Sequence, residues 1–132
     1  MKILYAEDHS EKYMDVVMAL KSQGIKGVKW VESVSEAVDA ALREEGEGGF
    51  DVVLTDMEYP LAPNGNSSTE AGINLIRRLK EERINVPVVV LSSHNYEIPE
   101  ADASVWYSSR GDWERKLAEI IRRFSQRKES EM

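Results

Sequence analysis

The stretch FDVVLTD, from Phe50 to Asp56, places a short apolar run directly before an aspartate. The apolar positions Val52–Leu54 are continuous rather than alternating, which is typical of a strand buried on both faces of a parallel sheet. The residues that follow Asp56 are MEYP at 57–60. We therefore predict a buried strand over 50–55 that delivers Asp56 to one edge of a sheet.

Four further apolar runs predict strands, and helical patterns separate most of the five. The other predicted strands are Ile3–Ala6, Val28–Val31, Val86–Leu91 and Ala103–Tyr107. The predicted helices run from Ser10 to near Gly24, from Ser33 to Gly46, from about Glu70 to Arg83, and from Trp113 to about Phe124. This alternation predicts an α/β fold: a doubly wound, five-stranded parallel sheet with right-handed crossovers.

Cap residues and apolar spacing predict how the helices begin and which faces they bury. Ser10 is the expected cap of the first helix, and Ser33 with Glu36 has capping-box spacing. The expected core positions recur at helical spacing. They are Met14, Val17, Met18 and Leu20, then Val38, Ala41 and Leu42, then Ile73, Leu75, Ile76 and Leu79, and finally Leu117, Ile120 and Ile121.

The link after the fourth strand differs from the others. It spans Ser92–Asp102, and Pro99 interrupts it. At most a turn or two of helix fits there, because proline breaks a helix interior. We expect the fourth helix to be shortened or irregular.

Length and charge restrict the classes of function. The 132 residues suit one domain, expected over 1–124 with a charged tail at 125–132. With 17 basic and 24 acidic residues the net charge is -7, which disfavours nucleic acid and anionic membranes as partners.

Cysteine is absent, so disulfides and thiolate catalysis are excluded, and a cytoplasmic location is expected. The opening apolar run is too short for a signal peptide.

Acidic residues follow two of the predicted strands. Glu7 and Asp8 follow the first strand, and Asp56 and Glu58 follow the third. If these strands are neighbours, the carboxylates converge, and such a cluster is costly unless it holds a cation or a proton. Oxygen ligands of this kind suit Mg²⁺. The alternative is that each acid caps a helix or ends a strand in solvent.

Hydroxyl residues follow the strongest predicted strand. Ser92 and Ser93 come directly after Leu91, where their hydroxyls could donate to an oxyanion in the same crevice. A serine pair at this place also serves as a helix cap or turn.

Taken in order, these motifs resemble the response-regulator receiver domain of two-component signalling. The matching segments are ILYAED (3–8), FDVVLTDMEYP (50–60), Ala71-Gly72 and VPVVVLS (86–92), and together they cover nearly the whole chain. Each is weak alone, but all occur in register. The resemblance implies the flavodoxin-like receiver fold.

The resemblance also implies roles for the acids. Asp56 is expected to accept a phosphoryl group as an acyl phosphate. Glu7, Asp8, Asp56 and the backbone carbonyl of Glu58 are expected to hold Mg²⁺, directly or through water. The metal offsets charge on the transferring phosphoryl oxygens.

Three further residues, and the side chain of Glu58, have implied roles. Ser92 is expected to bond a phosphoryl oxygen and to move inward, and Trp106 on the fifth strand is expected to repack in response. Alternatively, Trp106 is a plain core residue. Glu58 and His94 lie two residues after Asp56 and Ser92, flanking the path of a hydrolysing water, so they could tune the acyl-phosphate lifetime. Alternatively, His94 is an exposed loop residue.

The chain departs from the family pattern at the end of the fifth strand. The family has a lysine there, whereas Ser109, or less favourably Ser108, occupies the position here. Arg110 could reach into the site, or it is an ordinary surface residue. A longer loop, Leu61–Thr69, is a second departure. It could cover the site, contact a partner or be a tolerated surface insertion.

Two functions remain open from the sequence. The first is a single-domain receiver that takes a phosphoryl group from a sensor histidine kinase or another phosphodonor. It signals through a downstream protein partner, with a homodimer possible. The second is a receiver-fold binding module that works without phosphorylation, which the missing lysine favours. An aspartate-nucleophile phosphatase needs an Asp-x-Asp pattern after the first strand, so an enzyme acting on a separate substrate is not expected. The short tail after Phe124 suggests signalling through a partner, unless the chain is part of a longer protein.

Overall fold

A five-stranded parallel sheet forms the centre of the computed structural model, which describes residues 1–108 and 111–130. The predicted doubly wound α/β fold is therefore confirmed. The strands lie in the order β2 (Val28–Val31), β1 (Ile3–Ala6), β3 (Val52–Thr55), β6 (Val88–Ser92) and β7 (Ala103–Trp106).

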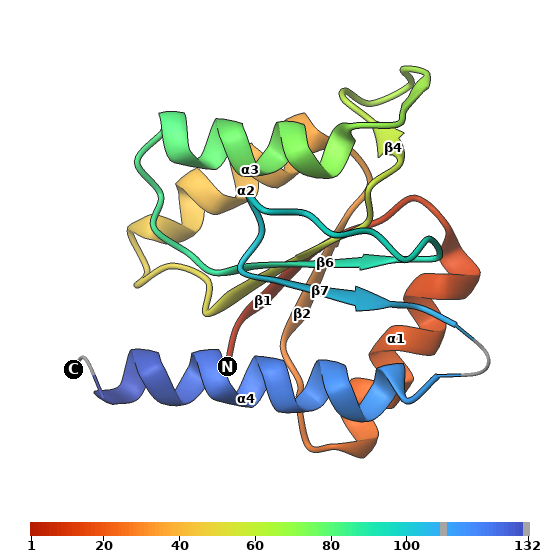
Figure 1. The fold of residues 1–132 in the computed structure, drawn as a ribbon. Helices are drawn as coiled ribbons and strands as arrows, with labels where there is room; N and C mark the ends of the chain where they lie inside the picture. Colours follow the sequence, from red (N-terminus) through yellow and green to blue (C-terminus); the bar gives the residue numbers. More distant parts are fainter. Residues whose placement is uncertain (109–110, 131–132) are drawn as a thin grey trace.

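Helices cover both faces of this sheet. Figure 1 shows α2 (Val34–Glu45) and α3 (Ala71–Glu81) on one face, and α1 (Ser10–Ser22) and α4 (Trp113–Ser130) on the other. No helix among residues 1–108 and 111–130 is long and apolar enough to cross a membrane.

The central strands bury side chains on both faces, which explains their continuous apolar runs. Leu4 pairs with Val53, and both join the core under α2 and α3. The next pair, Tyr5 with Leu54, joins the core under α1 and α4. Each strand therefore supplies two cores and carries almost no polar side chain until it ends.

The buried face of α1 differs from the prediction. Met14 and Met18 are 59% and 66% exposed, whereas Lys12, Val16 and Leu20 are buried. The buried positions are spaced by four residues, and this row packs toward the sheet. The prediction included Leu20 but missed Lys12 and Val16, because the row begins with a lysine. On α2, Leu42 is likewise exposed rather than buried.

The helix ends confirm one predicted cap and correct two other expectations. Ser33 Oγ accepts a 3.2 Å hydrogen bond from the Glu36 backbone N–H, as the capping box predicts. His9 rather than Ser10 precedes α1 as its cap residue, without a capping hydrogen bond from its side chain. The last helix continues past Phe124 to Ser130, so most of the charged tail is helical.

Two connections shape the edge of the sheet. Residues 93–102 contain no helix, which confirms the expected irregular link between β6 and β7. The predicted loop after Pro60 is instead part of an antiparallel hairpin, β4 (Tyr59–Pro60) with β5 (Ser67–Ser68). The Leu61 carbonyl accepts a hydrogen bond from Ser35 N–H, which fastens this hairpin to the start of α2. In Figure 1 the hairpin extends beyond the first turn of α3.

Candidate functional site

The predicted polar residues meet at one edge of the sheet. Strands β1, β3 and β6 are parallel neighbours, so Glu7, Asp8, Asp56 and Ser92 emerge at the same edge. A cleft of about 650 Å³ opens there. The residues lining it include Asp8, Lys12, Asp56, Glu58, Ser92, His94 and Tyr107.

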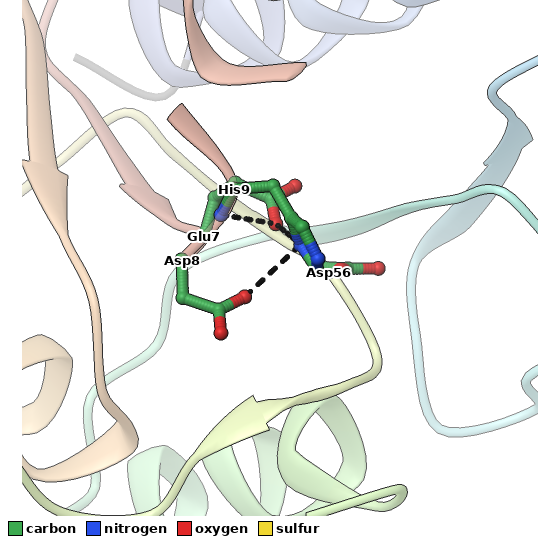
Figure 2. A group of neighbouring side chains, drawn as sticks. All are labelled: Glu7, Asp8, His9 and Asp56. Carbon is green, nitrogen blue, oxygen red and sulfur yellow. Dashed lines mark hydrogen bonds and ion pairs between the residues drawn. The ribbon is translucent and has the colours of Figure 1, made fainter. Parts of the chain in front are cut away.

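Three carboxylates and one imidazole form a compact cluster beside this cleft. One ligand atom from each of Glu7, Asp8, His9 and Asp56 lies within 4.8 Å of all the others. Figure 2 shows these four side chains gathered together, with His9 reaching across toward the acids. Glu7 is fully buried and Asp56 is 8% exposed. The Met57 backbone N–H donates to Asp56 Oδ1 at 2.8 Å, which holds that carboxylate in place.

A buried lysine, missed by the sequence analysis, lies among these acids. Lys12 Nζ is 2.9 Å from Glu7 Oε1, 3.3 Å from Asp56 Oδ1 and 2.7 Å from the Leu91 carbonyl oxygen. The side chain is only 7% exposed. An ammonium has three donors, and three acceptors surround this one. The available signal was the spacing of four that places Lys12 on the same helix face as Val16 and Leu20.

Burial sets the electrostatics of Glu7. Removal from water raises its pKa, and the nearby charge of Asp56 acts in the same direction, whereas Lys12 opposes both. The Tyr5 hydroxyl donates to Glu7 Oε1 at 3.1 Å, and Trp30 Nε1 donates to the Glu7 backbone carbonyl at 2.6 Å. The indole therefore touches the backbone of the site.

His9 is a second site residue that the sequence analysis did not identify. Its Nδ1 lies 3.3 Å from Glu7 Oε2 and 3.1 Å from Asp8 Oδ1. Partial desolvation acts against the charged imidazole, but the hydrogen bond to Glu7 and the charge of Asp8 outweigh it and raise the pKa of His9. Its position directly after the acidic pair could have indicated this.

The donor set fits a divalent cation. Asp8 Oδ1 is buried, yet its contact with His9 lacks hydrogen-bond geometry, and no other described residue donates to it. A buried carboxylate oxygen without a donor suits a hard cation such as Mg²⁺. Glu7, Asp8 and Asp56 supply the carboxylates. The Glu58 side chain is exposed and lines the cleft, and a metal contact from its carbonyl stays a prediction.

Ser92 and His94 lie on the opposite side of Asp56 from β1, because β6 pairs with the other edge of β3. Ser92 is 3% exposed, and its Oγ accepts a 3.2 Å hydrogen bond from the His94 backbone N–H. His94 is an exposed loop residue, and it also lines the cleft. Its effect on acyl-phosphate lifetime stays a prediction.

The end of β7 presents two aromatic residues. Trp106 is 49% exposed and donates from Nε1 to the Ser93 carbonyl at 3.0 Å, so the alternative that it is a core residue is wrong. The Tyr107 hydroxyl donates to Asp15 Oδ2 at 2.6 Å, and Lys12 Nζ lies 5.4 Å from the Tyr107 ring centroid. Partial burial and the Asp15 carboxylate raise the pKa of Tyr107 to about 12.

The predictions for Ser109 and Arg110 fall on residues outside the part of the chain that the structure describes. The neighbouring Ser108, the less favoured position for the family lysine, is described and half-buried. Among the described residues, the lysine that contacts the acids of the cleft is Lys12 on α1.

Comparisons with known proteins support the fold. No protein-family model matches the chain, and no curated protein matches it. Among solved structures, a response regulator receiver domain protein from Clostridium thermocellum superposes with a TM-score of 0.74 at 22% identity, covering 99% of this chain and 98% of that one. A Francisella response regulator receiver domain gives a TM-score of 0.72 at 20% identity, covering 96% and 98%.

A third structure carries a metal. It is the receiver domain of a Pseudomonas aeruginosa sensor histidine kinase with a magnesium ion coordinated in its active-site cleft. Its TM-score is 0.70 at 20% identity, covering 93% of this chain and 95% of that one. These likenesses confirm that the chain has the receiver fold indicated by its sequence motifs.

Proposed function

We propose that this chain, which has the fold of response-regulator receiver domains, accepts a phosphoryl group on Asp56 and signals through protein contacts. The observation that carries the proposal is the position of Asp56. Its carboxylate ends the central strand β3, is 8% exposed, and shares one cleft with Asp8, Lys12 and Ser92. A nucleophilic carboxylate, paired acids and a hydroxyl donor are the groups that phosphoryl transfer to aspartate needs.

In the proposed reaction, a carboxylate oxygen of Asp56 attacks the phosphorus of the donor. The new oxygen–phosphorus bond forms as the bond to the donor's leaving group breaks, and that group departs with the electron pair. The Met57 N–H orients the Asp56 carboxylate, and the Ser92 hydroxyl donates to a phosphoryl oxygen. Mg²⁺, held by Glu7, Asp8 and Asp56, supplies positive charge against the phosphoryl oxygens when it is bound.

The phosphodonor is a sensor histidine kinase or a small acyl phosphate, and the output is a protein partner or a second copy of this chain. The net charge of -7 disfavours nucleic acid and membranes as direct partners. Trp106 is exposed on the strand that follows the irregular 93–102 link, so a phosphoryl-dependent change there reaches the surface. The domain acts as a switch, with its own phosphorylation and hydrolysis as its only chemistry.

Intact-mass spectrometry tests the proposal. The protein is incubated with acetyl phosphate and Mg²⁺, beside an Asp56→Asn control and a sample containing beryllofluoride instead of acetyl phosphate. We expect the mass of one phosphoryl group on the wild type and none on the control. A folded wild type that gains no mass and does not bind beryllofluoride contradicts the proposal and favours the phosphorylation-independent binding module.

A further inference from the structure

We propose that Lys12, on helix α1, is the catalytic cation that stabilises the phosphoryl group on Asp56 and links that group to strand β6. This inference rests on the proposed function and assigns a residue to it. Lys12 Nζ is 3.3 Å from Asp56 Oδ1, so it already contacts the group that reacts. In the described part of the chain, no other lysine or arginine forms an ion pair with Asp56.

Charge gives the first reason. Glu7, Asp8 and Asp56 are all acidic, and phosphorylation replaces the single negative charge of Asp56 with about two on the phosphoryl group at neutral pH. A cation that is fixed in place before the reaction stabilises the developing charge most strongly where water is excluded, and Lys12 is 7% exposed. An ammonium on a flexible stem can turn from the carboxylate oxygen to a phosphoryl oxygen without moving α1.

Connectivity gives the second reason. The Leu91 carbonyl that accepts from Lys12 belongs to the residue directly before Ser92, the proposed hydroxyl donor. If the ammonium turns toward the phosphoryl group, it weakens this 2.7 Å bond. The Lys12 side chain then connects the phosphorylated Asp56 to the backbone of β6. The ring centroid of Tyr107, which directly follows β7, lies 5.4 Å from the same Lys12 Nζ.

If Lys12 has this role, replacing it with a neutral residue should strengthen Mg²⁺ binding and slow phosphoryl uptake. Lys12→Met removes a positive charge beside two proposed metal ligands, so Mg²⁺ should bind about threefold or more tightly. The same change should slow phosphoryl uptake from acetyl phosphate about tenfold or more, because a charge-assisted contact is lost. A lysine that only supports the fold would leave both quantities unchanged or weaken both.

Two measurements read these effects. Trp30 contacts the Glu7 carbonyl, so its fluorescence reports Mg²⁺ titrations, and intact-mass spectrometry at timed intervals reports phosphoryl uptake. Lys21→Met is the matched control, because Lys21 lies on the same helix, is exposed and carries the same charge. The control should match the wild type in both measurements.

Chemical rescue keeps the test valid if Lys12→Met is poorly folded. The chain has no cysteine, so Lys12→Cys places one thiol at this position alone. Alkylation with 2-bromoethylamine in denaturant, followed by refolding, restores an ammonium on a side chain of lysine length. Alkylation with iodoacetamide gives a neutral counterpart. We expect the aminoethylated protein to regain at least half the wild-type uptake rate and the neutral form to stay slow.

The outcomes separate the two claims. If the wild type gains the phosphoryl group and folded Lys12→Met gains it at the wild-type rate, this inference is overturned and the proposed function stands. A refolded aminoethylated protein no faster than its neutral counterpart also overturns the inference. If the folded wild type gains no phosphoryl group and does not bind beryllofluoride, the proposed function fails and the role of Lys12 fails with it.

Discussion

Lys12 donates a 2.7 Å hydrogen bond to the carbonyl oxygen of Leu91, across 79 positions of sequence. The contact joins the first turn of α1 to the strand that ends at Ser92. The same ammonium lies 2.9 Å from the fully buried Glu7. The positive charge of Lys12, although it comes from α1, therefore lies at the edge of the sheet where phosphoryl transfer is proposed to occur.

This burial predicts a stability effect. Lys12→Met leaves the Glu7 carboxylate buried without its cation, so the free energy of unfolding without Mg²⁺ should fall by about 3 kcal/mol. Urea unfolding in the presence of a chelator measures the change. Mg²⁺ should stabilise this variant more than the wild type, because the ion replaces the missing positive charge. Equal stability of Lys12→Met and the exposed Lys21→Met would show that the buried pair contributes nothing.

A second prediction concerns the packing of α3 against the phosphoacceptor. A Cβ atom at Gly72 would lie 2.7 Å from the Asp56 carbonyl oxygen, closer than any real contact of this kind. Gly72→Ala should lower the free energy of unfolding by about 2 kcal/mol, although alanine favours helix more than glycine does. Phosphoryl uptake should slow as well, because the Asp56 backbone must shift.

Gly46→Ala is the matched control for this substitution. Gly46 has an α-helical φ of -69°, and its nearest atom to an added Cβ is 3.9 Å away. The thermal unfolding midpoint of Gly72→Ala should be clearly lower than that of Gly46→Ala. Similar midpoints would mean that α3 adjusts without strain.

The β4–β5 hairpin supports the site through a buried hydroxyl. The Tyr59 hydroxyl lies 2.7 Å from Thr55 Oγ1, which in turn donates to the Asp56 carbonyl at 2.7 Å. Tyr59→Phe removes one buried hydrogen bond and should cost about 1 kcal/mol of unfolding free energy. Tyr96→Phe, at a 41% exposed site, should cost nothing measurable. If urea unfolding shows that Tyr96→Phe loses more stability than Tyr59→Phe, the buried Tyr59 hydroxyl does not support the site.

The switch role of Ser92 predicts a fluorescence difference. Beryllofluoride should change the emission of Trp106 in the wild type, and Ser92→Ala should lose most of that change while still binding the ligand. The reason is that the hydroxyl couples the bound group to β6, which pairs Ser92 with Trp106. Trp106→Phe identifies the signal, since Trp30 and Trp113 remain in it. A full response in Ser92→Ala contradicts the coupling.

Much of this fold follows from local pattern. Strand Ile3–Ala6 is buried and apolar on both faces, and it was predicted with the bounds that the structure has. The edge strand Val28–Val31, in which Lys29 and Trp30 are exposed, was also predicted with its observed bounds. The acids could be assigned to one edge because parallel strands end together. Ser33 with Glu36 predicted the start of α2, and Pro99 predicted the irregular link between β6 and β7.

Lys12 could not be found in this way, because a lysine is ordinarily a solvated residue. Its burial depends on contacts with Glu7, Asp56 and Leu91, which lie up to 79 residues away. The exposure of Met14 and Met18 has the same origin. Apolar spacing alone did not distinguish the face of α1 that packs on the sheet from the face two residues away, and tertiary packing decided it.

The most direct test is to locate the phosphoryl group chemically. An acyl phosphate on aspartate is reduced by borohydride to homoserine, whereas a phosphate ester on serine or threonine is not. After incubation with acetyl phosphate and Mg²⁺, reduction and peptide sequencing by mass spectrometry, our account predicts homoserine at position 56 and at no other acidic position. Homoserine at Asp8 or another aspartate, 2-amino-5-hydroxypentanoic acid at Glu7 or another glutamate, or no reduced residue in a protein that remains folded would contradict it.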